Sequence, residues 1–138
     1  MLKKTITYTD YDGRERTEDF YFNLTKAELI EMDFSAKGGM QKLLEQITET
    51  NDRKRLIELA KDLILRSYGV KSEDGRRFVK TKELSEEFSQ TEAFSELFVE
   101  VGTDDGAAVA FVKGILPRGL AAEVDKAAAE NLLTNPTI

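Results

Sequence analysis

The first 22 residues constrain the fold most strongly, because their side chains alternate in the way that a β-ribbon requires. Two runs of β-branched and aromatic residues flank the pair Asp12–Gly13, and such a pair between alternating runs is a strong hairpin signal. Residues two apart share a face of a strand. The apolar residues that share faces in this way are Ile6 with Tyr8 and Phe20 with Phe22. We therefore predict a β-hairpin over residues 2–22 that needs the rest of the chain to cover one face.

Beyond the hairpin, the spacing of apolar residues changes to that of helices. Thr25 followed by Glu28 fits a capping box, which predicts a short helix that ends near Phe34. Apolar residues at helical spacing predict further helices over about residues 40–50, 52–68, 81–90, 91–101 and 104–116. The predicted fold class is α+β and predominantly helical, with the N-terminal hairpin packed on a bundle of about five or six short helices.

The segment after the helix over residues 52–68 contains two turn signals. Gly69 stands where a helix C-cap glycine belongs. Residues 70–80 then contain the pair Asp74–Gly75 between β-branched and aromatic residues. This second pair predicts a small hairpin or an ordered loop.

The C-terminal part of the chain differs in composition from the rest. Pro117 stops or kinks the chain, and the alanine-rich residues 118–133 predict a helix with a thin apolar stripe. We predict one compact domain over residues 1–117. We also predict a C-terminal helix and tail over residues 118–138 that is either mobile or partner-binding.

The charge and the hydropathy pattern exclude two classes of partner. The chain has 20 Lys and Arg residues against 26 Asp and Glu residues, a net charge of −6, with both signs interspersed. Such a surface repels a phosphate backbone, so no nucleic-acid partner is expected. No apolar run approaches the roughly 20 residues that span a bilayer, and the N-terminus lacks the apolar run of a signal peptide. We therefore expect no membrane association and a cytoplasmic location.

The residue types available leave little room for catalysis. The chain contains 0 His and 0 Cys residues, which removes the usual nucleophile–base pairs, zinc sites and thiol chemistry. Carboxylate chemistry remains, but 33% of the residues are charged, so acids at any spacing are expected by chance. The segment from Tyr8 to Asp19 superficially resembles a calcium loop, and a hairpin turn explains it better. We predict no catalytic residue, no cofactor, no metal site and no enzymatic activity.

Two segments offer side chains to a protein partner. Tyr21 stands between Phe20 and Phe22, so consecutive aromatic residues face both sides of the ribbon, and core packing accounts for the two phenylalanines. The alanine-rich C-terminal helix presents the remaining candidates along its apolar stripe. The predicted partner-binding residues are Tyr21, Leu120, Val124, Leu132 and Leu133.

Three stretches of the chain resemble one protein family. They are residues 10–29 (DYDGRERTEDFYFNLTKAEL), 63–80 (LILRSYGVKSEDGRRFVK) and 90–98 (QTEAFSELF). These stretches are similar to tail assembly chaperones of long-tailed phages, the siphophages, that infect Gram-positive bacteria. Their order and spacing extend the resemblance over most of residues 1–117. The motifs carry no catalytic residue, so no functional residue is transferred to this chain.

The resemblance implies a protein that acts during phage morphogenesis. It implies binding to the tape measure protein, maintenance of that protein in soluble form, and help for tail tube subunits that polymerise around it. The implied partners are therefore the tape measure and tail tube proteins, and self-association is compatible with this role. The implied location is the host cytoplasm, with absence from the mature virion.

Two other classes of protein stay open on the sequence. The first is a small non-enzymatic regulatory adaptor that binds one folded phage or host protein, and binding to a folded protein instead of tape measure fragments would favour it. The second is a carboxylate-dependent enzyme, which a magnesium-dependent shift in melting temperature would reveal.

Overall fold

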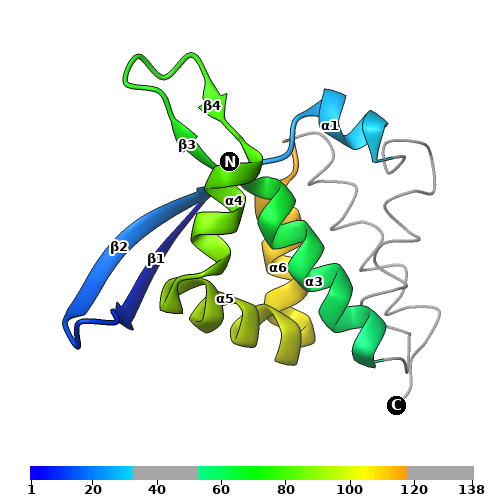
Figure 1. The fold of residues 1–138 in the computed structure, drawn as a ribbon. Coiled ribbons are helices and arrows are strands. Elements are labelled where there is room, and N and C mark those ends of the chain that lie inside the picture. Colours follow the sequence, from blue (N-terminus) through cyan, green and yellow to red (C-terminus); the bar gives the residue numbers. More distant parts are fainter. Residues whose placement is uncertain (33–52, 118–138) are drawn as a thin grey trace.

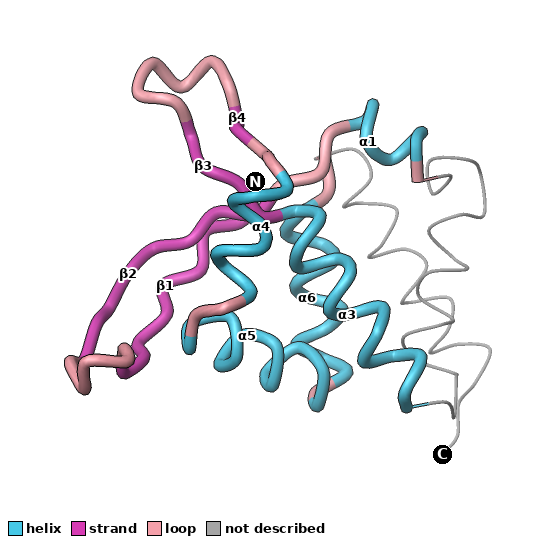
Figure 2. The backbone as a smooth tube through the Cα atoms, viewed as in Figure 1, coloured by secondary structure: helices cyan, strands magenta, loops and turns pink. Residues whose placement is uncertain are grey.

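The computed structural model describes residues 1–32 and 53–117, which form one antiparallel sheet and five helices (Figure 1). The sheet has four strands in the order β1 (Leu2–Thr9), β2 (Glu15–Phe22), β3 (Tyr68–Lys71) and β4 (Phe78–Val79), so each strand lies beside its neighbour along the chain (Figure 2). The described helices lie to one side of the β1–β2 ribbon in Figure 1. The predicted α+β class is therefore confirmed.

The predicted N-terminal hairpin is present. Strands β1 (Leu2–Thr9) and β2 (Glu15–Phe22) pair along their whole length, with Leu2 opposite Phe22 and Thr9 opposite Glu15. In the turn, the Asp10 N–H donates to the Arg14 carbonyl at 2.8 Å and the Gly13 N–H donates to the Asp10 carbonyl at 3.0 Å. Gly13 has a φ of 81°, a left-handed conformation that glycine adopts without strain. The Asp12–Gly13 signal thus marks the turn.

The core forms where the helices pack on the apolar face of the ribbon. Phe22 is fully buried, and its ring centroid lies 5.8 Å from those of Tyr68 and Phe88 and 5.4 Å from that of Phe111. Phe20 is half-buried against Phe88, with ring centroids 5.2 Å apart. The aromatic residues of β2 therefore join three segments that are distant in the sequence.

Four of the described helices begin at polar caps that the sequence contains. The described helices after α1 (Lys26–Glu31) are α3 (Arg53–Ser67), α4 (Lys82–Ser89), α5 (Glu92–Thr103) and α6 (Asp105–Ile115). The side chains of Thr81, Thr91 and Asp104 each accept a backbone N–H at the start of the helix that follows, which satisfies donors that a helix start leaves free. These helices confirm the predictions over residues 52–68, 81–90, 91–101 and 104–116. The predicted helices over residues 40–50 and 118–133 lie outside the described residues, and the domain boundary at residue 117 stays a prediction.

The prediction that Gly69 caps a helix is wrong. Helix α3 ends at Ser67, whose buried hydroxyl donates to the carbonyls of Leu63 and Ile64 at 2.6 and 3.2 Å. Gly69 instead lies in strand β3 (Tyr68–Lys71), opposite Tyr21 of β2. Helix-end carbonyls need a donor, and here the serine hydroxyl supplies one.

The predicted hairpin within residues 70–80 is confirmed. Strand β3 pairs with strand β4 (Phe78–Val79), with Val70 opposite Val79. The turn between them is closed by the Gly75 N–H, which donates to the Ser72 carbonyl at 3.0 Å, and Gly75 has a φ of 73°. The same turn chemistry therefore forms both hairpins of the sheet.

Helix α1 (Lys26–Glu31) is held to the rest of the fold by an ion pair. The predicted capping box is present, because Thr25 and Glu28 exchange side-chain-to-backbone hydrogen bonds. Glu28 also pairs with Lys80 at 2.6 Å, and the Lys80 ammonium donates to the Asn23 carbonyl at 2.5 Å. Burial opposes ionisation of the Glu28 carboxyl, but the hydrogen bonds from Lys80 and from the Thr25 N–H outweigh it, so the pKa of Glu28 lies below its ordinary value.

We expect Glu28→Gln to lower the free energy of unfolding by about 1 kcal/mol near neutral pH. This is the usual contribution of a hydrogen bond between charged groups, reduced because the pair is partly exposed. Glutamine keeps the capping box, so the variant tests the charge alone. Because folding lowers the pKa of Glu28, the pair stabilises the protein above the ordinary glutamate pKa, and this contribution is lost as pH falls through the lowered value. The gap in melting temperature between wild type and variant should therefore shrink on acidification. Glu31→Gln, an exposed change in the same helix, is the control, and a pH-independent gap would contradict the assignment.

Candidate interaction surfaces

The acidic side chains of the described residues do not cluster in the way that metal ligands would. Within residues 1–32 and 53–117, no group of three or more His, Cys, Asp or Glu side chains could hold a metal ion. The pKa values of Asp10 and Asp74 are lowered chiefly by side-chain hydrogen bonds, from Arg16 and Ser72 respectively, and both carboxyls stabilise turns. The surfaces of interest are therefore those that a protein partner could contact. No helix of the described part is long and apolar enough to cross a membrane.

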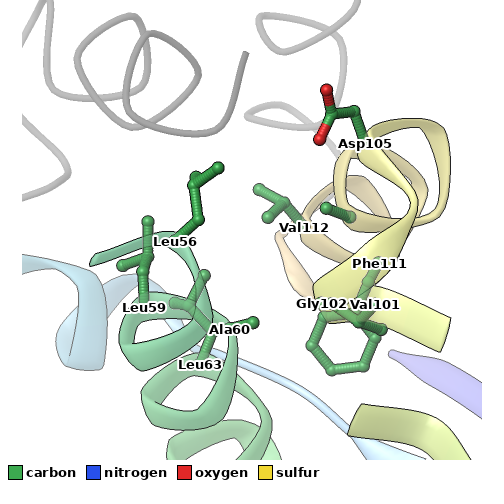
Figure 3. A pocket seen from close by; sticks show the side chains of 10 residues that line it. Leu56, Leu59, Ala60, Leu63, Val101, Gly102, Asp105, Phe111 and Val112 are labelled. Carbon is green, nitrogen blue, oxygen red and sulfur yellow. The ribbon is translucent and has the colours of Figure 1, made fainter. Parts of the chain in front are cut away.

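An apolar groove lies between α3, α6 and the C-terminal end of α5 (Figure 3). We call it the helical groove. It is lined by Leu56, Leu59, Ala60, Leu63, Val101, Gly102, Asp105, Ala108, Phe111 and Val112. Among the lining residues that belong to the described parts of the chain, Asp105 is the single charged one, so this part of the groove is suited to an apolar ligand surface bounded by a carboxylate.

The helical spacing of α3 explains one wall of the groove. Residues three and four apart lie on one helix face, which places Leu56, Leu59, Ala60 and Leu63 together. Ala60 and Leu63 are buried, whereas Leu56 and Leu59 are only half-buried. Figure 3 shows Leu56 and Val112 facing the space between their helices. The half-buried leucines therefore provide apolar surface at the mouth of the groove.

A second groove opens where β2 and β3 diverge, and we call it the strand groove. Its lining residues are Glu18, Asp19, Phe20, Tyr21, Tyr68, Gly69, Val70 and Lys71. Among these, Val70 is 44% exposed. Gly69 has no side chain, so β3 lines this groove partly with its backbone, a feature of sites that accept an extended chain.

The structure places one predicted partner-binding residue and leaves the others untested. Tyr21 lines the strand groove, half-buried, with the Lys71 ammonium 4.6 Å from its ring centroid. This cation–π contact and the pairing with Gly69 hold the ring in place. The remaining candidates, Leu120, Val124, Leu132 and Leu133, lie outside the described residues. The role of Tyr21 in partner binding stays a prediction.

The sequence pattern does not predict that the residues of the helical groove form a surface that a protein partner could contact. In the helix predicted over residues 52–68, Ala60 and Leu63 are buried, and Leu56 is half-buried and packs against the core. The partial exposure of Leu56 depends on how far α5 and α6 cover α3, which no local pattern encodes.

The helical groove is apolar and lies between helices, and grooves of this kind in other proteins receive an amphipathic helix. The chain belongs to the phage tail assembly chaperone family, whose family model matches residues 1–136. The role of this family is chaperoning, which is not a catalytic role. No curated protein and no solved structure matches the chain.

Proposed function

We propose that this chain binds the tape measure protein of its phage, keeps it soluble and promotes tail tube assembly around it in the host cytoplasm. The chaperone would leave before the tail is complete and would be absent from the virion. The observation that carries the proposal is the helical groove, an apolar surface on a member of the tail assembly chaperone family.

The chemistry of the groove fits an amphipathic helix. An unassembled tape measure protein is long and helical and has apolar surface to cover, and a helix of this kind presents apolar residues one turn apart. Such a side chain could contact Phe111 and Val112 on the floor and Leu56 at the mouth. Burying one leucine or phenylalanine contributes about 1.5 to 3 kcal/mol, so a contact with one groove is weak. Weak contacts suit a chaperone that must release its client.

Residues 118–133 would extend the binding surface. Helix α6 ends at Ile115, and Pro117 then directs the chain out of the helix. The apolar candidates Leu120, Val124, Leu132 and Leu133 follow in the sequence and would add contacts to the client. Deletion of residues 118–138 is expected to lower the yield of soluble tape measure protein on co-expression. An unchanged yield would remove this segment from the proposal.

The proposal is tested by co-expression of the chain with the tape measure protein of its phage. We expect more of the tape measure protein in the soluble fraction than without the chain, and co-purification of the two. Absence of both effects, together with binding to a folded phage or host protein, would favour the adaptor function. The tail tube protein is the next partner to test in either case.

A charged residue introduced into the helical groove should weaken binding of the tape measure protein while leaving the chain folded. We expect Leu56→Glu to weaken tape measure binding at least about tenfold, because it removes one apolar contact and places a second carboxylate near Asp105. Ile57→Glu is the matched control, since Ile57 is 39% exposed, neighbours Leu56 and does not line the groove. Both variants lie near the start of α3, where a carboxylate favours the helix. Equal binding by the two variants, measured by pull-down, would exclude the groove.

A further inference from the structure

The hairpin formed by β3 and β4 projects from the body of the protein, and we call its residues 70–79 the finger. Figure 1 shows the finger extending away from the described helices, beyond the point where β3 leaves β2. The exposed residues of the finger are Val70, Lys71, Glu73, Asp74, Gly75, Arg76 and Arg77. None of these residues belongs to the core of the described structure, so their side chains are available to a partner.

The tip of the finger is fixed by hydrogen bonds of its own. The Ser72 N–H donates to the Arg77 carbonyl at 2.8 Å, and the Ser72 hydroxyl oxygen accepts from the Arg77 N–H at 3.0 Å. The Asp74 carboxylate accepts from the Ser72 hydroxyl at 2.7 Å and from the Arg76 N–H at 3.0 Å. A loop that is ordered before binding loses less conformational entropy when a partner arrives. The turn therefore holds the backbone of both arginines in a defined position.

The base of the finger is anchored to the sheet. The Phe78 ring lies so close to Gly69 that a Cβ on the glycine would come within 2.7 Å of it. The Lys71 ammonium lies 4.6 Å from the centroid of the Tyr21 ring on β2, and such a contact is attractive. The charge of Lys71 is thus engaged within the sheet, whereas the two arginines lie farther out at the tip.

Arg76 and Arg77 are exposed cations that are not paired within the described parts of the chain. Neither guanidinium forms an ion pair with an acidic side chain there. The planar fork of a guanidinium binds a carboxylate through two parallel hydrogen bonds. A continuous polyanion fits less well, because it would also bring negative charge against Glu73 and Asp74 and against a chain of net charge −6. The tip therefore favours a partner with separate carboxylates.

The register of the finger places apolar surface beside Arg77. Val70 lies opposite Val79, and the Ser72–Arg77 pair follows two residues farther along. Because residues two apart share a face of a strand, Val70, Val79 and Arg77 lie on one face. Val70 is 44% exposed and Val79 is half-buried. This face combines a guanidinium with apolar surface, which matches a helix that carries carboxylates beside its apolar stripe.

We propose that the finger binds an acidic amphipathic helix of a partner protein, with Arg76 and Arg77 on its carboxylates and Val70 on its apolar residues. This site is separate from the helical groove. None of the described lining residues of the groove belongs to the finger. The finger follows the end of α3, whereas Leu56 of the groove lies near the start of that helix.

Fluorescence anisotropy with a labelled synthetic helix tests the proposal. The probe is a peptide of about 14 residues, or roughly four helical turns, with glutamates on one face and leucines on the adjoining face. In the control peptide, glutamines replace the glutamates. We expect the wild-type chain to bind the probe at least about tenfold more tightly than the control peptide, because only the probe offers carboxylates to the arginines. Equal binding of the two peptides would overturn the proposal.

Charge reversal at the tip locates the binding site. We expect Arg77→Glu to weaken probe binding at least about tenfold. Arg14→Glu is the matched control, because Arg14 is exposed in the turn of the other hairpin and its reversal changes the net charge equally. Arg77→Lys keeps the charge without the fork and should bind with intermediate affinity. Both arginines are exposed, so the melting temperature should change little in each variant. Equal binding by Arg77→Glu and Arg14→Glu would contradict the assignment.

Two further measurements separate the finger from other sites. Leu56→Glu, which alters the helical groove, should bind the probe as the wild type does. Loss of probe binding in Leu56→Glu, with binding retained in Arg77→Glu, would place the probe in the groove and overturn the proposal. Displacement of the probe by an equal concentration of single-stranded RNA would show a phosphate site and would also overturn it. These experiments use the purified chain without the tape measure protein, so their outcome is independent of the proposed function.

Discussion

Replacing Phe22 by alanine is expected to destabilise the fold by about 3 to 5 kcal/mol, the range for deleting a buried phenylalanine ring. Phe22 is the fully buried end of β2, and its ring contacts Tyr68, Phe88 and Phe111, which lie in or beside β3, α4 and α6. Its removal leaves a cavity where these elements meet. The hairpin and the helices should therefore lose stability together.

Thermal unfolding followed by circular dichroism measures this effect. For a chain of this length we expect the melting temperature of Phe22→Ala to fall by roughly 10 to 20 °C. Tyr11→Ala is the control, since Tyr11 is 77% exposed in the hairpin turn, and should shift the melting temperature by only a few degrees. A small effect of Phe22→Ala would show that Phe22 does not join the sheet to the helices.

The second large effect is expected at Gly69, from a change that adds only one methyl group. A Cβ at this position would lie 2.7 Å from the Phe78 ring and 2.8 Å from the Val79 carbonyl oxygen. The carbonyl belongs to the backbone of β4, so the clash cannot be relieved by rotating a side chain. We expect Gly69→Ala to cost about 1 to 3 kcal/mol, as overpacking does, and to separate β3 from β4.

Gly102→Ala is the matched control for that substitution. A Cβ at Gly102 would meet the Phe98 ring at 3.4 Å, an ordinary contact, and alanine is preferred to glycine within a helix by about 0.5 to 1 kcal/mol. Urea denaturation should therefore show opposite signs for the two glycine-to-alanine changes. Two changes of the same sign would contradict the close approach at Gly69.

Local patterns predicted much of the described fold, because the forces involved act over a few residues. The Asp12–Gly13 and Asp74–Gly75 pairs mark both hairpin turns, and Gly13 and Gly75 have the positive φ values that such turns need. Thr25 forms the capping box expected from its spacing to Glu28. Caps and turns of this kind are satisfied by neighbours in the sequence, so the sequence contains the whole signal.

Features that depend on distant contacts were not predictable in the same way. Gly69 was interpreted as a helix cap because a glycine after a helix usually has that role. Its actual role depends on Phe78 and Val79, which approach only when β3 and β4 pair. The helical groove likewise depends on the packing of three helices, and the environment of Tyr21 depends on Lys71. The sequence predicted that Tyr21 stands apart from the core phenylalanines, but it could not predict that β3 lies beside it.

Hydrogen–deuterium exchange on the complex of this chain with the tape measure protein tests the central claim most directly. The free and bound chains would be compared peptide by peptide. If the helical groove binds the client, exchange should slow in peptides that cover the start of α3 and the start of α6, where Leu56, Leu59 and Ala108 line the groove. Peptides from the hairpin turn around Asp12 should be unchanged. Protection confined to other peptides, with α3 and α6 exchanging as in the free chain, would contradict the account.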